Sequence, residues 1–155
     1  MDIRSIGFSR RAAWCFALFL TSACSPAPRI ALQYGGDLKQ TDFEKVLADN
    51  PLAAKDNIKI TTLGQGREVS HHIVQIRDRE RPHLHQRHDG TVFMFKGSGY
   101  LIMDKVRIDL SASDVVYIPR GTVHYFVNTG SEPAVAFVVF APPFDGKDTV
   151  PVDSR

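Results

Sequence analysis

Two histidines spaced two residues apart, His83 and His85, are the residues of this sequence best placed to bind a metal ion. On a β-strand, residues i and i+2 point to the same face, so both imidazoles can converge on one point. Imidazole is a common protein ligand for Zn, Fe, Cu and Ni. Two surface histidines in a polar loop is the competing interpretation, because the charged residues 77–81 come just before them.

A third histidine, His124, lies in a second segment, where a turn containing Pro and Gly leads into β-forming residues. Together the two segments resemble the motifs of the cupin superfamily, G-x5-H-x-H-x(3,4)-E-x6-G and G-x5-P-x-G-x2-H-x3-N. The matching residues are His83, His85 and Gly97 in the first motif and Pro119, Gly121, His124 and Asn128 in the second, with Ser113 in place of the leading glycine. The resemblance covers residues 68–141, and the short separation of the motifs, residues 98–112, is typical of compact bacterial members.

The resemblance implies an all-β fold, a single-domain jelly roll or double-stranded β-helix barrel, here with a short N-terminal helix. It also implies one divalent ion (Fe, Mn, Zn, Cu or Ni) held by His83, His85 and His124. The glutamate ligand of the first motif is missing, because Gly90 occupies its position. If Asp89 turns inward it becomes a fourth ligand, and otherwise the site is a bare set of three histidines. His88 is expected to be a solvated neighbour rather than a ligand.

The candidates for a general base are Asp89 and one of the adjacent pair His71 and His72, of which we name His72. Neighbouring residues on a strand face opposite ways, so only one of the pair can point into a barrel, and the apolar pattern does not decide which. A buried or a solvated histidine without a chemical role is the competing interpretation for each.

The function that the resemblance implies is binding of a small organic molecule at a metal ion, with oxygenase- or isomerase-type chemistry such as that of a metal-dependent dioxygenase. The alternative is a non-catalytic protein that captures a metal or a small ligand. A metal-free structural cupin is a third hypothesis. The resemblance to this superfamily also implies that the protein forms a homodimer.

The first part of the chain predicts export. Residues 1–23 combine basic residues with an apolar run, 12–23, that is too short to span a bilayer, as expected for a signal peptide. The small residues before Cys24 resemble a bacterial lipobox, which implies a lipid on Cys24 and attachment to a membrane in the periplasm or at the cell surface. Ordinary cleavage after Ala23 is the alternative, and the export route, unfolded or twin-arginine, is left open.

Removal of the signal peptide also changes the charge and the cysteine content. The whole chain has 19 Lys and Arg against 17 Asp and Glu, and without residues 1–23 it has 16 of each. A neutral domain gives no electrostatic reason to expect nucleic-acid binding. Cys15 leaves with the signal, so Cys24 cannot form an internal disulfide, and metal ligands must be imidazole or carboxylate.

The remaining elements follow in order along the chain. Residues 24–40 are predicted to be a tether, and residues 41–155 a cupin domain whose core is 68–141. Thr41 to Glu44 is a helix start, and the helix should stop near Asn50 and cover one end of the barrel. Short strands with Gly and Pro turns follow, and residues 134–140, apolar throughout, predict a strand buried on both faces. Val92, Met94, Phe126 and Phe137 are expected to line the pocket, and the tail 141–155 to wrap the outside.

Overall fold

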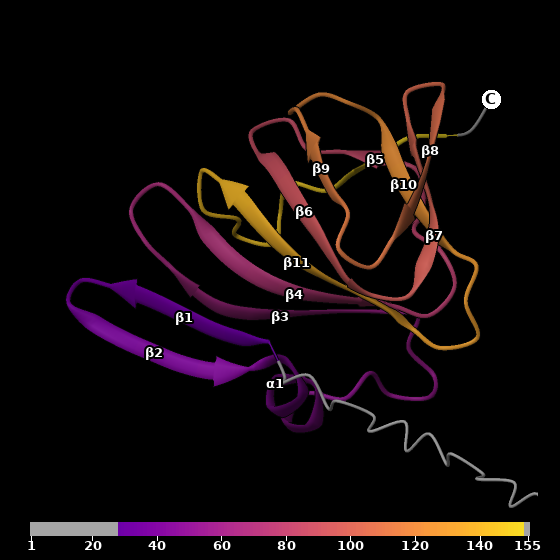
Figure 1. The fold of residues 1–155 in the computed structure, drawn as a ribbon. Helices are drawn as coiled ribbons and strands as arrows, with labels where there is room; N and C mark the ends of the chain where they lie inside the picture. Colours follow the sequence, from indigo (N-terminus) through magenta and orange to yellow (C-terminus); the bar gives the residue numbers. More distant parts are fainter. Residues whose placement is uncertain (1–27, 154–155) are drawn as a thin grey trace, which may run out of the picture.

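A computed structural model of the chain describes residues 28–153, and two five-stranded antiparallel sheets packed face to face dominate it (Figure 1). The first sheet contains, in spatial order, β3 (Ile58–Gln65), β4 (Ser70–Ile76), β11 (Ala134–Ala141), β6 (Asp89–Lys96) and β9 (Val115–Ile118). The second contains β12 (Val150–Pro151), β5 (His83–Leu84), β10 (His124–Asn128), β7 (Ser98–Met103) and β8 (Val106–Ser111). This arrangement confirms the predicted all-β jelly-roll barrel.

Strand β11 forms the centre of the first sheet, between β4 and β6. Its inward side chains, such as Val138 and Phe140, join the core between the two sheets, while Val135 packs on the outer side. Strand β4 behaves the same way, with Val74 inside and Ile73 outside. Both strands are apolar on both faces because both faces of the sheet are covered.

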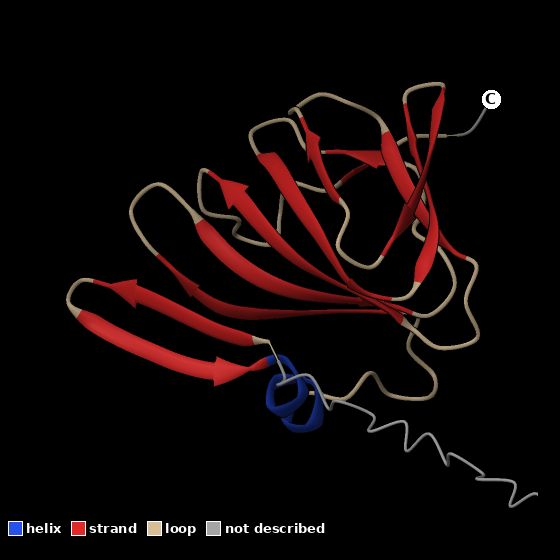
Figure 2. Cartoon of the chain, viewed as in Figure 1, coloured by secondary structure: helices blue, strands red, loops and turns tan. Residues whose placement is uncertain are grey.

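The outer cover is a hairpin and a helix, seen beside β3 and β4 in Figure 1 and coloured by structure in Figure 2. Strands β1 (Arg29–Tyr34) and β2 (Asp37–Asp42) pair with each other, and α1 (Phe43–Asp49) follows directly. Ile30, Phe43 and Val46 are buried against Ile73 and Val135. The predicted tether over residues 24–40 is therefore wrong for residues 29–40, which belong to the folded unit.

The predicted helix is confirmed, but its place differs from the expectation. Asp42 caps it, because its Oδ1 atom accepts the backbone N–H of Lys45 at 2.7 Å. The ring of Phe43 stacks on Phe95 at 3.6 Å and contacts the edge of Phe137. The helix thus covers the outer face of the first sheet rather than an end of the barrel, and Phe137 faces this layer, not the pocket.

The predicted signal peptide, residues 1–23, and Cys24, the predicted site of lipid attachment, lie outside the described residues. Within residues 28–153, no helix combines the length and the apolar character needed to cross a membrane.

Candidate metal centre

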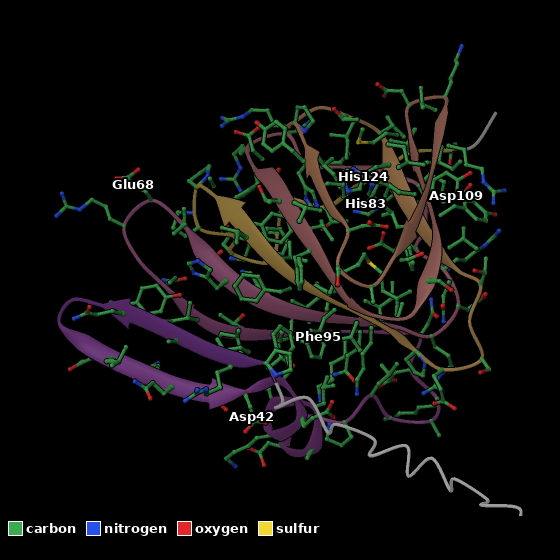
Figure 3. The ribbon with its side chains drawn as sticks, in the orientation of Figure 1. Asp42, Glu68, His83, Phe95, Asp109 and His124 are labelled. Atoms are coloured by element: carbon green, nitrogen blue, oxygen red, sulfur yellow. The ribbon has the colours of Figure 1, made fainter. Side chains whose placement is uncertain are left out.

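His83, His85 and His124 meet inside the barrel, as the spacing of the motifs predicts. His83 on β5 and His124 on β10 are directly opposite each other in the antiparallel register, and Figure 3 shows their side chains next to each other. His85 follows His83 by two residues and so shares its face. One ring nitrogen from each of the three lies within 4.8 Å of the other two, and all three residues are buried.

The second nitrogen of each ring is hydrogen-bonded to a backbone carbonyl. Nδ1 of His83 lies 2.8 Å from the oxygen of Arg81, Nδ1 of His85 lies 2.7 Å from that of Asp148, and Nδ1 of His124 lies 3.0 Å from that of Thr122. A carbonyl oxygen can only accept a hydrogen bond, so each Nδ1 carries the proton and donates it. The lone pair of each Nε2 is then free for a metal ion.

Burial favours the neutral form of two of these imidazoles, those of His124 and His85. It lowers the pKa of His124 to about 4, and it also lowers the pKa of His85 below the usual range. A neutral ring with a free nitrogen is the form that binds a metal ion. The burial, the oriented tautomers and the mutual distances therefore fit a single divalent ion bound by three histidines.

The structure does not bring Asp89 to this cluster. Its carboxylate accepts three hydrogen bonds from Arg120, one from the backbone N–H at 2.9 Å and two from the guanidinium at 2.6 and 3.1 Å. These hydrogen bonds lower the pKa of Asp89 to about 2. Gly90, at the position of the missing glutamate, is the residue that faces inward, next to the ring of Phe140. The alternative with three histidines alone is therefore the arrangement observed.

His72 is the inward member of the pair His71 and His72, but it is not part of the cluster of three histidines. Its Nε2 contacts the hydroxyl of Ser70 at 2.7 Å and its Nδ1 that of Thr62 at 3.2 Å, and the residue is almost completely buried. The ring of Phe140 packs against both His72 and His85. With both nitrogens bonded and an aromatic ring beside it, His72 is placed as a core residue rather than as a general base.

The C-terminal tail contributes to the site, which the sequence did not indicate. Asp148 is buried, and its carboxylate accepts the backbone N–H groups of Gln86 and Arg87 and pairs with Nδ1 of His88 at 2.5 Å. Burial acts to raise the pKa of Asp148, but the hydrogen bonds from His88 and the two backbone amides lower it to about 2. His88 is buried as well, so the expectation of a solvated neighbour is wrong, and the tail does more than wrap the outside.

The histidines open onto a cavity of about 400 Å³ between the two sheets. Most of its lining is apolar, and it includes the predicted residues Val92, Met94 and Phe126. Glu80, which belongs to the charged segment 77–81, also lines it. Burial raises the pKa of the Glu80 carboxyl, against the opposing effects of nearby His83 and of a hydrogen bond from Phe126.

The charged segment 77–81 is held against the second sheet. The segment runs along β10 and is bonded to it, because Asn128 donates its backbone N–H to the oxygen of Asp78 at 2.7 Å and Arg79 forms a β-bridge with Val127. The sequence of this segment does not show the alternation of apolar and polar residues that marks a half-buried strand, because it alternates positive and negative charges instead. Asn128 itself closes a turn by donating to the carbonyl oxygens of Arg77 and Glu132.

Comparisons with known proteins agree with this fold. Residues 70–140 match a cupin domain family. An uncharacterised protein of Aquifex aeolicus is 34% identical over 112 residues, which are 72% of this chain and 91% of the relative.

Solved structures with the same fold include KdgF from Halomonas sp., at 21% identity and a TM-score of 0.55 over 60% of this chain and 86% of that one. TT1209 from Thermus thermophilus matches at 18% identity and a TM-score of 0.56 over 67% and 97%. Streptomyces PAC13, solved with uridine, matches at 21% identity and a TM-score of 0.55 over 65% and 82%. At this identity the likeness shows the fold alone. The two motifs, the barrel and the matched domain establish that this chain belongs to the cupin superfamily.

Proposed function

We propose that this protein binds one divalent metal ion at His83, His85 and His124 and uses it to act on a small organic molecule in the barrel. One observation carries the proposal: three buried imidazoles, each with Nδ1 held by a backbone carbonyl, direct their free nitrogens to one place at the wall of an apolar cavity. Such a pre-oriented set of nitrogen donors suits Fe, Mn, Zn, Cu or Ni, and the choice among them depends on the metals available where the site is filled.

When bound, the ion would act as a Lewis acid towards a carbonyl or enol group, or as a redox centre for oxygen chemistry. The chain supplies the rest of the environment. Three neutral histidines leave further positions of the ion open to a ligand, and the apolar walls exclude bulk water and favour a small organic molecule. This arrangement supports isomerase- or oxygenase-type chemistry. A structural relative, Pac13, is a nucleoside dehydratase, which is consistent with a small-molecule substrate for this fold.

A second candidate function is non-catalytic capture of a metal or small ligand. The observation that favours it is the missing carboxylate ligand, since Gly90 replaces the glutamate and Asp89 is bonded to Arg120. Fewer protein ligands leave the ion more dependent on what else binds to it. Ligand binding by the metal-loaded protein without any turnover would favour this alternative.

The first test is the metal content of the protein after expression with each metal supplied. We expect about one ion per chain, and we expect His83→Ala, His85→Ala and His124→Ala each to lose it. His71→Ala is the matched control, because His71 lies on the outer side of β4, bonded to the hydroxyl of Tyr34, and should leave the metal content unchanged. Folded wild-type protein without any bound ion would contradict the proposal and favour a metal-free structural cupin.

A further inference from the structure

Glu80 is one of the residues that line the cavity of the three histidines. Two hydrogen bonds fix it to β10: its backbone N–H donates to the oxygen of Phe126 at 2.9 Å, and its Oε2 accepts the backbone N–H of Phe126 at 2.9 Å. Phe126 follows the metal ligand His124 by two residues. The side chain of Glu80 therefore has a defined position next to the site and is not a mobile surface group.

The other oxygen of this carboxylate, Oε1, has no hydrogen-bond donor within residues 28–153. Oε1 is also not fully buried. In the described part of the chain, Oγ1 of Thr61 is the only side-chain oxygen or nitrogen that is both fully buried and without a hydrogen-bond partner. No arginine, lysine or histidine of the described residues forms an ion pair with it. Oε1 is consequently not enclosed by protein atoms, and because Glu80 lines the cavity we infer that this oxygen is accessible from it.

A carboxylate beside apolar walls is costly unless something pairs with it. A divalent ion held by neutral imidazoles would bring positive charge into the same cavity, which offsets part of that cost. A hydrogen-bond donor on the ligand would satisfy the free oxygen directly, and a bond to a charged acceptor is stronger than one between neutral groups.

We propose that Oε1 of Glu80 accepts a hydrogen bond from the organic molecule bound in the cavity. The ligand class is then a small molecule that combines an oxygen able to reach the metal ion with a hydroxyl or amino group. This inference rests on the proposed metal-dependent function and assigns the ligand contact that neither Asp89 nor His72 is placed to make.

Benzoate and the three isomeric monohydroxybenzoates are suitable probes, because each carries a carboxylate for the ion and only the three isomers carry a hydroxyl. Their affinities for Co²⁺-loaded protein would be measured by calorimetry in the wild type, Glu80→Gln and Glu80→Met. At least one isomer should bind the wild type about tenfold more tightly than benzoate. Both substitutions should reduce that ratio to about twofold or less. The ratio of the two affinities is compared between proteins because a changed charge near an anionic ligand affects benzoate and hydroxybenzoate alike, and this common effect cancels.

Glu68→Gln is the matched control, because Glu68 is exposed and lies far from the labelled histidines in Figure 3. The inference is overturned if no isomer is favoured by the wild type, if none of the four probes binds, or if the hydroxyl preference survives in Glu80→Gln. Glutamine keeps the acceptor for Phe126, and the visible spectrum of bound Co²⁺ would show that the three histidines are intact. Failure of the wild type to bind Co²⁺ is a different outcome, and it would contradict the proposed metal site itself.

Discussion

His124 is the least exposed of the three histidines of the site, and burial lowers its pKa to about 4. In the unfolded chain its pKa is about 6.5, so between these values the unfolded state binds more protons than the folded state. The stability of the metal-free protein should therefore rise with pH across this window. Acidification from pH 7 to pH 4 should remove on the order of 3 kcal/mol through this residue, a loss that is complete below pH 4.

Denaturant unfolding of the metal-free protein between pH 4 and pH 7 would measure this effect. His124→Gln removes the titrating group, and its stability should depend less steeply on pH than that of the wild type. Equal pH dependence in the two proteins would contradict the assigned environment of His124. In the metal-loaded protein the ion competes with protons for the same nitrogen, so the ion should be released over the same acidic range.

The sequence predicts the three histidines because their signals are local. His83 and His85 share a strand face, and the motif of His124 starts a second strand, so the pleat alone orients the rings. Glu80 and Asp148 have no such signal. Glu80 looks like one more charge in an alternating loop, and its burial depends on hydrogen bonds to Phe126, 46 residues away. Asp148 follows His85 by 63 residues and reaches it only because the tail crosses the barrel.

Asp148 holds the C-terminal tail to the site. Asp148→Ala would remove the acceptor of two backbone amides and of His88, and should cost about 2–4 kcal/mol of stability. The tail also supplies the carbonyl that orients His85, so metal affinity should fall about 10- to 100-fold. Chelator competition gives the affinity and denaturant unfolding the stability.

Asp145→Ala is the control for this prediction. Asp145 lies in the same tail, but its side chain is exposed, where it accepts the backbone N–H of Lys147 at 2.9 Å and forms a 3.5 Å ion pair with Arg87. Its removal should change the stability by less than about 1 kcal/mol and leave metal affinity as it is. If Asp148→Ala lost stability but kept wild-type metal affinity, the tail would be a structural support without influence on the ligand His85.

The outer layer of hairpin and helix is a separate element with its own core. Phe43 is buried and stacks on Phe95, so Phe43→Ala should cost about 3–5 kcal/mol. Because this contact is on the side of the sheet away from the histidines, the variant should bind metal with wild-type affinity at temperatures where it is folded. Leu38→Ala on the exposed side of the same hairpin should change stability by less than about 0.5 kcal/mol.

This hairpin shows where sequence interpretation fails for an element. Strand β2, Asp37–Asp42, is mostly exposed and carries one large apolar residue, so it has no alternating pattern and resembles a polar linker. The informative signal is the pair Gly35 and Gly36, both at positive φ, which forms a two-residue turn of the hairpin type. Strand β11 is the opposite case, because its apolar run is a direct consequence of burial on both faces.

The barrel, the proposed metal site and the predicted export address are independent features of the protein. The address rests on residues 1–24 alone, and we propose that the protein is exported and attached to a membrane through a lipid on Cys24. In a bacterial host that processes lipoproteins, the wild-type chain should then appear in the membrane fraction and release with detergent. A lipid chain contributes about 0.8 kcal/mol per buried CH₂ group, so its loss should be visible in fractionation.

Cys24→Ser separates the two interpretations of the cleavage site. If the lipid is attached at Cys24, this variant should move from the membrane fraction to the soluble fraction, while Cys15→Ser, inside the apolar run of the signal, should stay with the membrane. Ordinary cleavage after Ala23 instead predicts that the wild type and both variants are soluble. Radiolabelled palmitate on the wild type but not on Cys24→Ser would identify the modification directly. Since the proposed metal ligands are all in the barrel, the soluble variant should contain as much metal as the wild type, which makes it the form in which the site can be studied.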